Sequence, residues 1–270
     1  MWRMSSSPGN GEVLALEGIS KSYGPVQALD GVDFRVRAGE VVALVGDNGA
    51  GKSTLVKVIS GIHDADSGRV LFNGRPVAIA KPNDAVELGI ATVHQDLALC
   101  DNLDVVANLF LGREEIGHGT AQVLRSLDET DMERQAHELL GSLAVTITDV
   151  RAEVGTMSGG QRQQVAISRA LLGEPKVMVL DEPTAALGVR QTAQVLDLIK
   201  RVRDQGQGVV LVSHNLADVF AVADRIFVLR LGKAAGDFES ADVSQERVVA
   251  AITGADTNGG PTADATEGAQ

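Results

Sequence analysis

The sequence predicts an α/β fold in which a parallel sheet is covered by crossover helices. Three continuous apolar runs have the length of buried strands: VVALV at 41–45, VMVL at 177–180 and VVLV at 209–212. Each run is followed by polar or glycine residues and then by a helical pattern, GKSTLVKVIS, RQTAQVLDLIKRVRD and NLADVFAVAD in turn. This alternation of strands and helices is typical of a parallel sheet.

The remaining elements differ from that alternation. GVDFRVR at 31–37 alternates apolar and polar residues, as a half-exposed strand does. Between about Leu97 and Gly155 the strand pattern fades, and DVVANLFLG and DMERQAHELLGSL have the periodicity of amphipathic helices. We therefore expect a helical subdomain, at about 97–172, inserted in the sheet domain.

The composition of the chain indicates where its folded body lies and which kinds of partner it disfavours. Residues 1–11 and 255–270 are rich in small and polar residues, so we expect disordered tails around one folded body, 12–254. The 36 acidic and 24 basic side chains give a formal net charge of -12. This balance argues against nucleic acid as a partner, because phosphate neutralisation needs clustered Lys and Arg. No run approaches the roughly 20 apolar residues of a membrane span, and Cys100 has no second cysteine for a disulfide.

A glycine-rich loop, GDNGAGKST at 46–54, follows the first buried strand and matches the P-loop pattern G-x-x-x-x-G-K-[ST]. Its glycines let successive N–H groups point to an anion at the helix N-terminus, where the helix dipole favours negative charge. We expect Lys52 to reach the β and γ phosphates and the Ser53 hydroxyl to ligate magnesium. The alternative is a glycine turn with an ordinary capping serine. The nucleotide-binding residues predicted in this loop are Gly46, Asn48, Gly49, Ala50, Gly51, Lys52, Ser53 and Thr54.

Two adjacent carboxylates end the second buried strand, in VMVLDEP. Carboxylates at such a place are costly if they are unpaired. Together with the P-loop, Asp181 is expected to hold magnesium and its waters, and Glu182 to polarise a water for attack on the γ phosphate of ATP. The alternative is a solvated strand end that caps the next segment.

With five further elements, these motifs make the sequence resemble the ATP-binding cassette (ABC) ATPases over essentially the whole body. Tyr23 in KSYGPVQAL resembles the aromatic residue that stacks on adenine. Gln95 in TVHQD resembles the Q-loop glutamine, which joins the metal shell. His214 in LVSHN resembles the switch histidine that contacts the γ phosphate. The resemblance implies catalytic roles for Lys52, Gln95, Glu182 and His214.

The same resemblance implies a P-loop NTPase fold, with a RecA-like mixed sheet and flanking helices. It adds an N-terminal antiparallel β subdomain to the inserted α-helical subdomain.

MSGGQ at 157–161 matches the family's signature motif, with Met157 where Leu is usual. Taken alone, MSGGQRQQ is a polar helix N-terminus with a capping serine. The resemblance implies that this N-terminus closes over ATP held by a second copy of the chain. The expected nucleotide contacts are Ser158, Gly159, Gly160 and Gln161, and the expected partner is a nucleotide-dependent homodimer.

The D-loop departs from the family pattern, because PTAALG has Gly188 where Asp is usual. That aspartate crosses the dimer seam, so its absence bears on coupling between the two sites and not on nucleotide binding. Two alternatives stay open: a soluble non-transport ABC ATPase, and an ATP-binding regulatory module with weak hydrolysis, which Gly188 favours.

Longer segments, such as VHQDLALCDNLDVVANLFLGRE, resemble the ATPases of bacterial ribose, xylose and fructose importers, in particular those with a single cassette. The resemblance implies a cytoplasmic protein, peripheral on the cytoplasmic face of the membrane. Its partners are then integral membrane permease subunits and, indirectly, an extracytoplasmic sugar-binding protein.

The segment 95–112 holds more apolar residues than a solvated loop needs, and it is the expected docking surface for the permease. The alternative is that these residues pack the helical subdomain. The residues concerned are Leu97, Leu99, Leu103, Val106 and Phe110.

Overall fold

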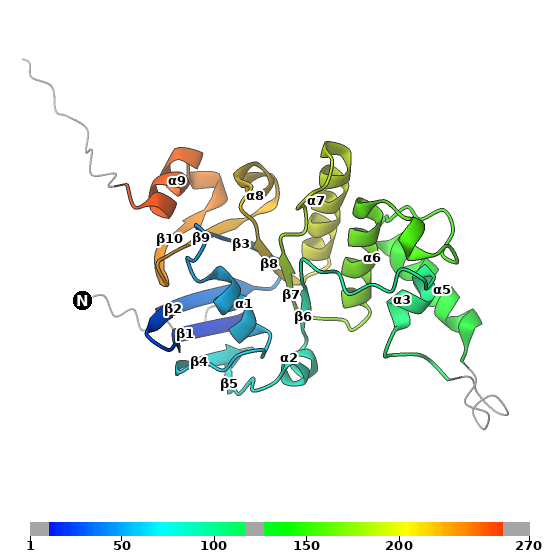
Figure 1. The fold of residues 1–270 in the computed structure, drawn as a ribbon, viewed down its shortest axis with the longest axis horizontal. Coiled ribbons are helices and arrows are strands. Elements are labelled where there is room, and N and C mark those ends of the chain that lie inside the picture. Colours follow the sequence, from blue (N-terminus) through cyan, green and yellow to red (C-terminus); the bar gives the residue numbers. More distant parts are fainter. Residues whose placement is uncertain (1–10, 117–126, 256–270) are drawn as a thin grey trace, which may run out of the picture.

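The fold is built on two sheets and is described here from a computed structural model that places residues 11–116 and 127–255 (Figure 1). The expected tails, 1–11 and 255–270, lie outside the described residues except for Gly11 and Ala255. Their disorder stays a prediction. None of the described helices combines the length and apolar character that a membrane span requires.

The central sheet has the strand order β10-β9-β3-β8-β7-β6 within the described residues. Neighbouring strands from β9 to β6 pair in parallel, and β10 pairs antiparallel with β9 at the edge. All residues of β3 and β8 are buried, which confirms the prediction of continuous apolar central strands. The strands are β3 (Val41–Val45), β6 (Ile90–Val93), β7 (Val177–Asp181), β8 (Gly208–Val212), β9 (Arg225–Arg230) and β10 (Lys233–Glu239).

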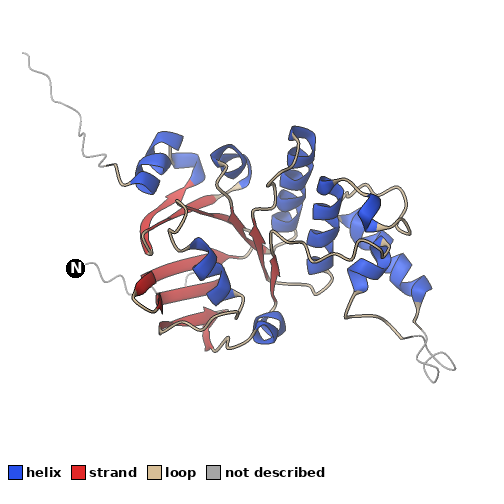
Figure 2. Cartoon of the chain, in the orientation of Figure 1, coloured by secondary structure: helices blue, strands red, loops and turns tan. Residues whose placement is uncertain are grey.

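A second, antiparallel sheet has the order β2-β1-β4-β5 in the part of the chain described (Figure 2). Its strand β2 alternates buried and exposed residues over 31–37, as the sequence predicts. The antiparallel subdomain that the family resemblance implies is therefore present. Its strands are β1 (Glu12–Tyr23), β2 (Val26–Arg37), β4 (Ser67–Phe72) and β5 (Arg75–Val77).

Helices cover the sheets and form a separate group at one end of the molecule, where α3, α5 and α6 lie together in Figure 1. Helix α6 packs against both α3 and α7, so the group joins the sheet domain. The helical subdomain of the predicted fold class is thus present, and its bounds at about 97–172 stay a prediction. The described helices are α1 (Lys52–Ile59), α2 (Pro82–Leu88), α3 (Val105–Phe110), α5 (Glu129–Ser142), α6 (Gly159–Leu171), α7 (Val189–Asp204), α8 (Leu216–Val222) and α9 (Gln245–Thr253), with short 3-10 turns at Val154–Thr156 and Ser240–Asp242.

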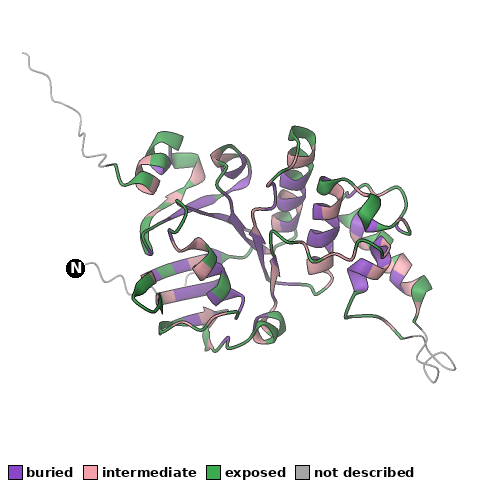
Figure 3. Cartoon of the chain, in the orientation of Figure 1, coloured by how far each residue is buried: buried purple, intermediate pink, exposed green. Residues whose placement is uncertain are grey.

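Two apolar clusters form the core, one on each face of the central sheet. In Figure 3 the strands of this sheet are coloured mainly as buried. Successive side chains of a strand point to opposite faces, so Val41, Ala43 and Val45 of β3 join the first cluster and Val42 and Leu44 the second. The first cluster continues into the helical subdomain, and the second into α1 and the antiparallel sheet. Strands β3, β8 and β7 are therefore fixed on both faces, and their carboxyl ends form a rigid edge.

Candidate functional site

The carboxyl ends of β3, β8 and β7 bring together segments that are far apart in the sequence. These three strands are neighbours in the central sheet, so the residues that follow them share one edge. The Glu182 backbone N–H, just after β7, donates to the carbonyl of Val212 at the end of β8, at 2.9 Å. Beyond β8, His214 Nδ1 lies 2.8 Å from Glu182 Oε2. Two residues that the sequence places 32 positions apart thus form one contact.

The loop after β3 needs glycine at two positions for steric reasons. Gly51 has φ 108, and a Cβ there would lie 2.6 Å from the Ala28 carbonyl oxygen of β2. A Cβ on Gly46, with φ 151, would meet the Leu229 carbonyl oxygen of β9. The loop therefore packs closely against the backbones of β2 and β9. Gly49 also has a positive φ but faces open space.

Lys52 begins α1 and bends back over this loop. Its Nζ donates to the carbonyls of Gly46 at 2.6 Å and Asp47 at 2.9 Å. Partial burial lowers the pKa of the ammonium, and the nearby carboxylates of Glu182, Asp47 and Asp181 act in the opposite direction. Lys52 is thus a cation held between the loop and the carboxylates that end β7. The helix start has no side-chain cap, and Ser53 in its first turn is exposed.

Asp181 and Glu182 form a partly desolvated acidic pair. Burial, and then the charge of Glu182, raise the pKa of Asp181, whereas His94 and Lys52 lower it. Glu182 itself has φ 52, a conformation that costs a non-glycine residue about 1–3 kcal/mol. Carboxylate and hydroxyl oxygens are the ligands that a hard divalent cation prefers, so the chemistry of Asp181 and Ser53 fits magnesium.

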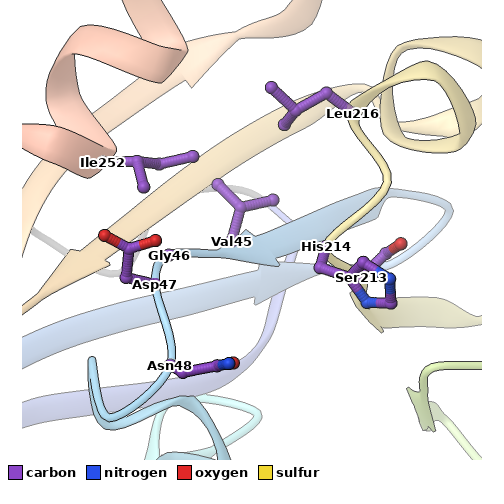
Figure 4. Close-up of a pocket in the computed structure, with 8 residues that line it drawn as sticks. All are labelled: Val45, Gly46, Asp47, Asn48, Ser213, His214, Leu216 and Ile252. Carbon is purple, nitrogen blue, oxygen red and sulfur yellow. The ribbon is translucent and has the colours of Figure 1, made fainter.

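A hollow of about 610 Å³ opens beside the loop (Figure 4). Asp47, Asn48 and His214 give it polar walls, and in Figure 4 apolar side chains of three different elements gather above the loop. One of them, Ile252, belongs to α9, a helix that no sequence motif predicts. The lining residues are Val45, Gly46, Asp47, Asn48, Ser213, His214, Leu216 and Ile252.

Tyr23 lies at the end of β1, in the antiparallel sheet, and its side chain is about 41% exposed. That sheet touches the glycine loop, since β2 supplies the carbonyl that Gly51 approaches. The Tyr23 ring makes an edge-to-face contact with His63, with centroids 5.5 Å apart. The structure therefore places this aromatic residue on the side of the loop formed by the antiparallel sheet.

Gln95 follows β6, the strand beside β7, and is exposed. The loop beyond it is held by Arg169 of α6, which donates to the carbonyls of Leu97 at 2.8 Å and Ala98 at 2.7 Å. Helix α6 thus holds the loop that carries Gln95.

Four of the five apolar residues predicted to form a docking surface in 95–112 pack against the core, and the fifth, Leu103, is half-buried. Val106 and Phe110 are fully buried in the first core cluster, and Leu97 and Leu99 pack against the same cluster. The interpretation that these four side chains pack the helical subdomain is therefore correct. For Val106 and Phe110 the reason is that the apolar face of α3 is turned to the core. A groove of about 250 Å³ remains beside them, and exposed Val86 and Leu111 contribute to it.

The signature segment forms the N-terminus of α6, with Ser158 as its cap. Ser158 Oγ accepts from the Gln161 N–H at 3.3 Å, and Gln161 Oε1 accepts from the Ser158 N–H at 3.1 Å. This reciprocal pair confirms the capping serine. A Cβ on Gly160 would lie 2.8 Å from Gln191 Cβ, so this glycine lets α6 pack closely on α7. Among the described residues, no hydrogen bond joins this N-terminus to the glycine loop of the same chain.

Gly188 precedes α7 beside this N-terminus, and its N–H donates to Gln191 Oε1 at 3.2 Å. The next residue, Val189, is 89% exposed. The segment before α7 and the signature segment therefore lie side by side, because a Cβ on Gly159 would lie 3.2 Å from Leu187 Cδ2.

The sequence profile of the ABC transporter family matches residues 29–185. Two relatives are similar over nearly their whole length. The fructose import ATP-binding protein FrcA of Rhizobium meliloti is 45% identical over 245 residues, which cover 90% of this chain and 94% of that protein. The xylose/arabinose import ATP-binding protein XylG of Sulfolobus acidocaldarius is 43% identical over 242 residues, with 90% and 94% covered.

Solved structures show the same arrangement of elements. A nucleotide-free ATP-binding cassette from an ABC transporter has a TM-score of 0.74 and 27% identity, covering 90% of this chain and 95% of that one. The ADP conformation of MJ1267, an ATP-binding cassette of an ABC transporter, has a TM-score of 0.76 and 28% identity with the same coverage.

Proposed function

The chain belongs to the ABC transporter family, and from this premise we propose that it is the ATP-hydrolysing subunit of a bacterial sugar importer. The observation that carries the catalytic part is the contact of His214 with Glu182 at the rim of the glycine loop. The sugar part is supported by the fructose and xylose/arabinose import proteins that resemble the chain.

We propose that ATP lies with its phosphates along the loop 46–54 and its adenine against Tyr23. The closely packed Gly46 and Gly51 shape the loop so that its backbone N–H groups face the phosphates. Lys52, which is now bonded to two loop carbonyls, would exchange them for phosphate oxygens. Burial disfavours the positive charge of the Lys52 ammonium. A negatively charged phosphate oxygen offsets this cost more than a neutral carbonyl does, which favours the exchange.

Magnesium would be held by Ser53, Asp181 and Gln95, and when bound it would offset the charge of the β and γ phosphates. The desolvation of Asp181 supports this assignment, because a cation beside that carboxylate relieves the repulsion from Glu182. Gln95 is exposed, and within the described part of the chain no hydrogen bond prevents its side chain from turning toward the same edge.

Glu182 is proposed to polarise the attacking water, and His214 to fix Glu182 and contact the γ phosphate. The bond from the Glu182 N–H to Val212 and the contact of its carboxylate with His214 hold the residue at both ends. The unfavourable φ of Glu182 is consistent with a side chain whose direction is imposed by the fold.

Two copies of the chain are proposed to enclose two ATP molecules between them. Ser158 and Gly159 are exposed at a helix N-terminus that, in the described residues, makes no hydrogen bond to the glycine loop of its own chain. An N-terminus with free N–H groups and a hydroxyl suits an anion, and the partner's γ phosphate is the proposed one. Gly160 and Gln161 would support this contact through the close packing and the capping bond described above.

The dimer is proposed to work at the cytoplasmic face of the membrane, beneath permease subunits that receive sugar from an extracytoplasmic binding protein. The groove near Leu111, on the helical subdomain, is the candidate contact for the permease. A regulatory module with weak hydrolysis is the second candidate, and the specific observation that favours it is Gly188 in the D-loop.

Purification of the tagged chain from membranes of its own cells tests the importer role. We expect a multi-span membrane protein to copurify. The reconstituted complex should take up fructose, ribose or xylose into liposomes only when ATP is present on the side of this subunit. Recovery of soluble partners alone would contradict the importer role without bearing on ATP hydrolysis.

A further inference from the structure

The segment after helix α1 holds the end of β1 at several points. Asp66 Oδ2 accepts from the Ser22 N–H at 2.7 Å, and its Oδ1 accepts from Lys21 Nζ at 2.8 Å. The Asp66 N–H donates to the Ser20 carbonyl at 2.8 Å. His63, three residues earlier, contacts the ring of Tyr23. Residues 63–66 therefore fix both the backbone before Tyr23 and its ring.

His63 is itself tied to the helix that begins at Lys52. The N–H groups of Ile62 and His63 both donate to the carbonyl of Lys57, at 2.9 and 3.2 Å, in the last turns of α1. An eight-residue helix is a rigid spacer of about 12 Å at 1.5 Å per residue. One helix thus carries Lys52 at its start and, just beyond its end, the residue that contacts Tyr23.

The Tyr23 ring needs such a support. It lies beside the hairpin turn at Gly24 and is about 41% exposed, so one part of its surface is open to solvent. The His63 ring meets it at an interplanar angle of 69°, and Lys21 Nζ lies 5.9 Å from its centroid. An edge-to-face ring pair restricts the rotation of an exposed side chain, and the exposed part of the Tyr23 ring is the surface left for a further contact.

We propose that His63 is a positioning residue for the nucleotide base: it holds the Tyr23 ring in the orientation that stacks on adenine. The proposal rests on the proposed contact of Tyr23 with adenine. His63 fixes the ring before the nucleotide arrives, so less side-chain freedom is lost on binding. The phosphate end of the nucleotide is bound through the glycine loop and does not depend on His63.

The experiment compares binding of ATP and of inorganic tripolyphosphate to the full-length protein by calorimetry, with magnesium present. His63→Ala should weaken ATP binding about 2- to 12-fold, the cost of ordering one free side chain on binding. Tripolyphosphate binding should not change, and kcat should stay at the wild-type value while KM for ATP rises. His63→Phe should restore ATP affinity, and His137→Ala, at an exposed position of α5, is the matched control.

Tyr23 is the only tyrosine in the sequence, so the NMR spectrum of protein labelled on its tyrosine ring contains the signals of this one ring. In the nucleotide-free protein the Tyr23 ring signals should shift in His63→Ala and not in His137→Ala. The same spectra show whether each variant is folded. Equal loss of ATP and tripolyphosphate binding, or no rescue by His63→Phe, would overturn the proposal.

Tyr23→Ala separates this inference from the proposed function. If Tyr23→Ala weakens ATP binding but His63→Ala does not, His63 has no positioning role. If Tyr23→Ala leaves ATP binding unchanged, the adenine contact assigned to Tyr23 is wrong, and the role of His63 is wrong with it.

Discussion

Replacement of Ser158 by alanine separates the two roles that this hydroxyl is proposed to have. In the folded chain, Ser158 Oγ accepts one hydrogen bond, from the Gln161 N–H at 3.3 Å. The bond from the Ser158 N–H to Gln161 Oε1 uses the backbone of residue 158 and survives the change. The lost bond is long and exposed, so the cost is at the low end for a helix cap, about 0.5–1 kcal/mol. For a chain of this size that lowers the melting temperature by about 1–4 °C.

Ser244 provides a chemically matched control. It caps α9, and its Oγ accepts from the Arg247 N–H at the same 3.3 Å. Ser244→Ala should therefore cost at least as much stability as Ser158→Ala, because the Ser244 hydroxyl also bonds the Glu246 carboxylate. Only Ser158 is proposed to bond the γ phosphate of ATP on a second copy, and a hydrogen bond to a charged group contributes about 1.5–3 kcal/mol. Ser158→Ala should then lower kcat about 10- to 150-fold.

The assay measures ATP turnover, ATP binding at protein concentrations where the chain is monomeric, and ATP-dependent dimerisation by light scattering. We expect Ser158→Ala to lose turnover and dimerisation with monomer binding intact, and Ser244→Ala to keep all three. A Ser158→Ala protein that loses ATP binding as a monomer, or an equal loss of turnover in both variants, would refute the assignment of Ser158 to the partner's nucleotide.

Three further changes test the energetics of the site and its support. Asp181→Asn should raise the melting temperature of the nucleotide-free protein at pH 7 and abolish magnesium-dependent turnover. Since the folded pKa of Asp181 lies above its unfolded value, the stability difference should be small below pH 3.8 and grow as pH rises, and a constant difference would contradict this. Arg225→Leu leaves the buried carboxylate of Glu40 without its 2.7 Å partner and should cost about 3–5 kcal/mol in denaturant unfolding; a loss below about 1 kcal/mol would show that the pair is not desolvated. Gly51→Ala combines a positive φ with a 2.6 Å contact and should cost about 2–4 kcal/mol, against about 1 kcal/mol for Gly49→Ala in open space; equal losses would mean that the contact with Ala28 relaxes freely.

The central strands and the glycine loop could be predicted because each has a local signal. A strand buried on both faces is a continuous apolar run, and β3, β7 and β8 have that pattern. The glycine loop has glycine, lysine and serine at fixed spacing, between a predicted strand and a predicted helix. The antiparallel sheet was expected only from the family resemblance, because β1 pairs with β4 across more than 40 residues and no local pattern encodes that pairing.

Other features depend on tertiary packing that periodicity does not specify. An apolar helix face looks the same whether it meets the core or a partner, which is why Val106 and Phe110 were also candidates for a docking surface and are in fact buried. Ile252 beside the loop and His63 beside Tyr23 could not be predicted, because each contact joins elements whose relative placement is set by the whole fold. The contact of His214 with Glu182 follows from the adjacency of β7 and β8.

ATP hydrolysis by the wild-type chain beside Glu182→Gln tests the central claim most directly. We predict magnesium-dependent release of phosphate by the wild type, and a rate about 10²- to 10⁴-fold lower in Glu182→Gln, because the amide cannot accept a proton from the attacking water. The variant should still bind ATP and form an ATP-stabilised dimer. A wild type that binds ATP without turnover even beside its permease, or a Glu182→Gln protein that hydrolyses ATP at the wild-type rate, would contradict the account.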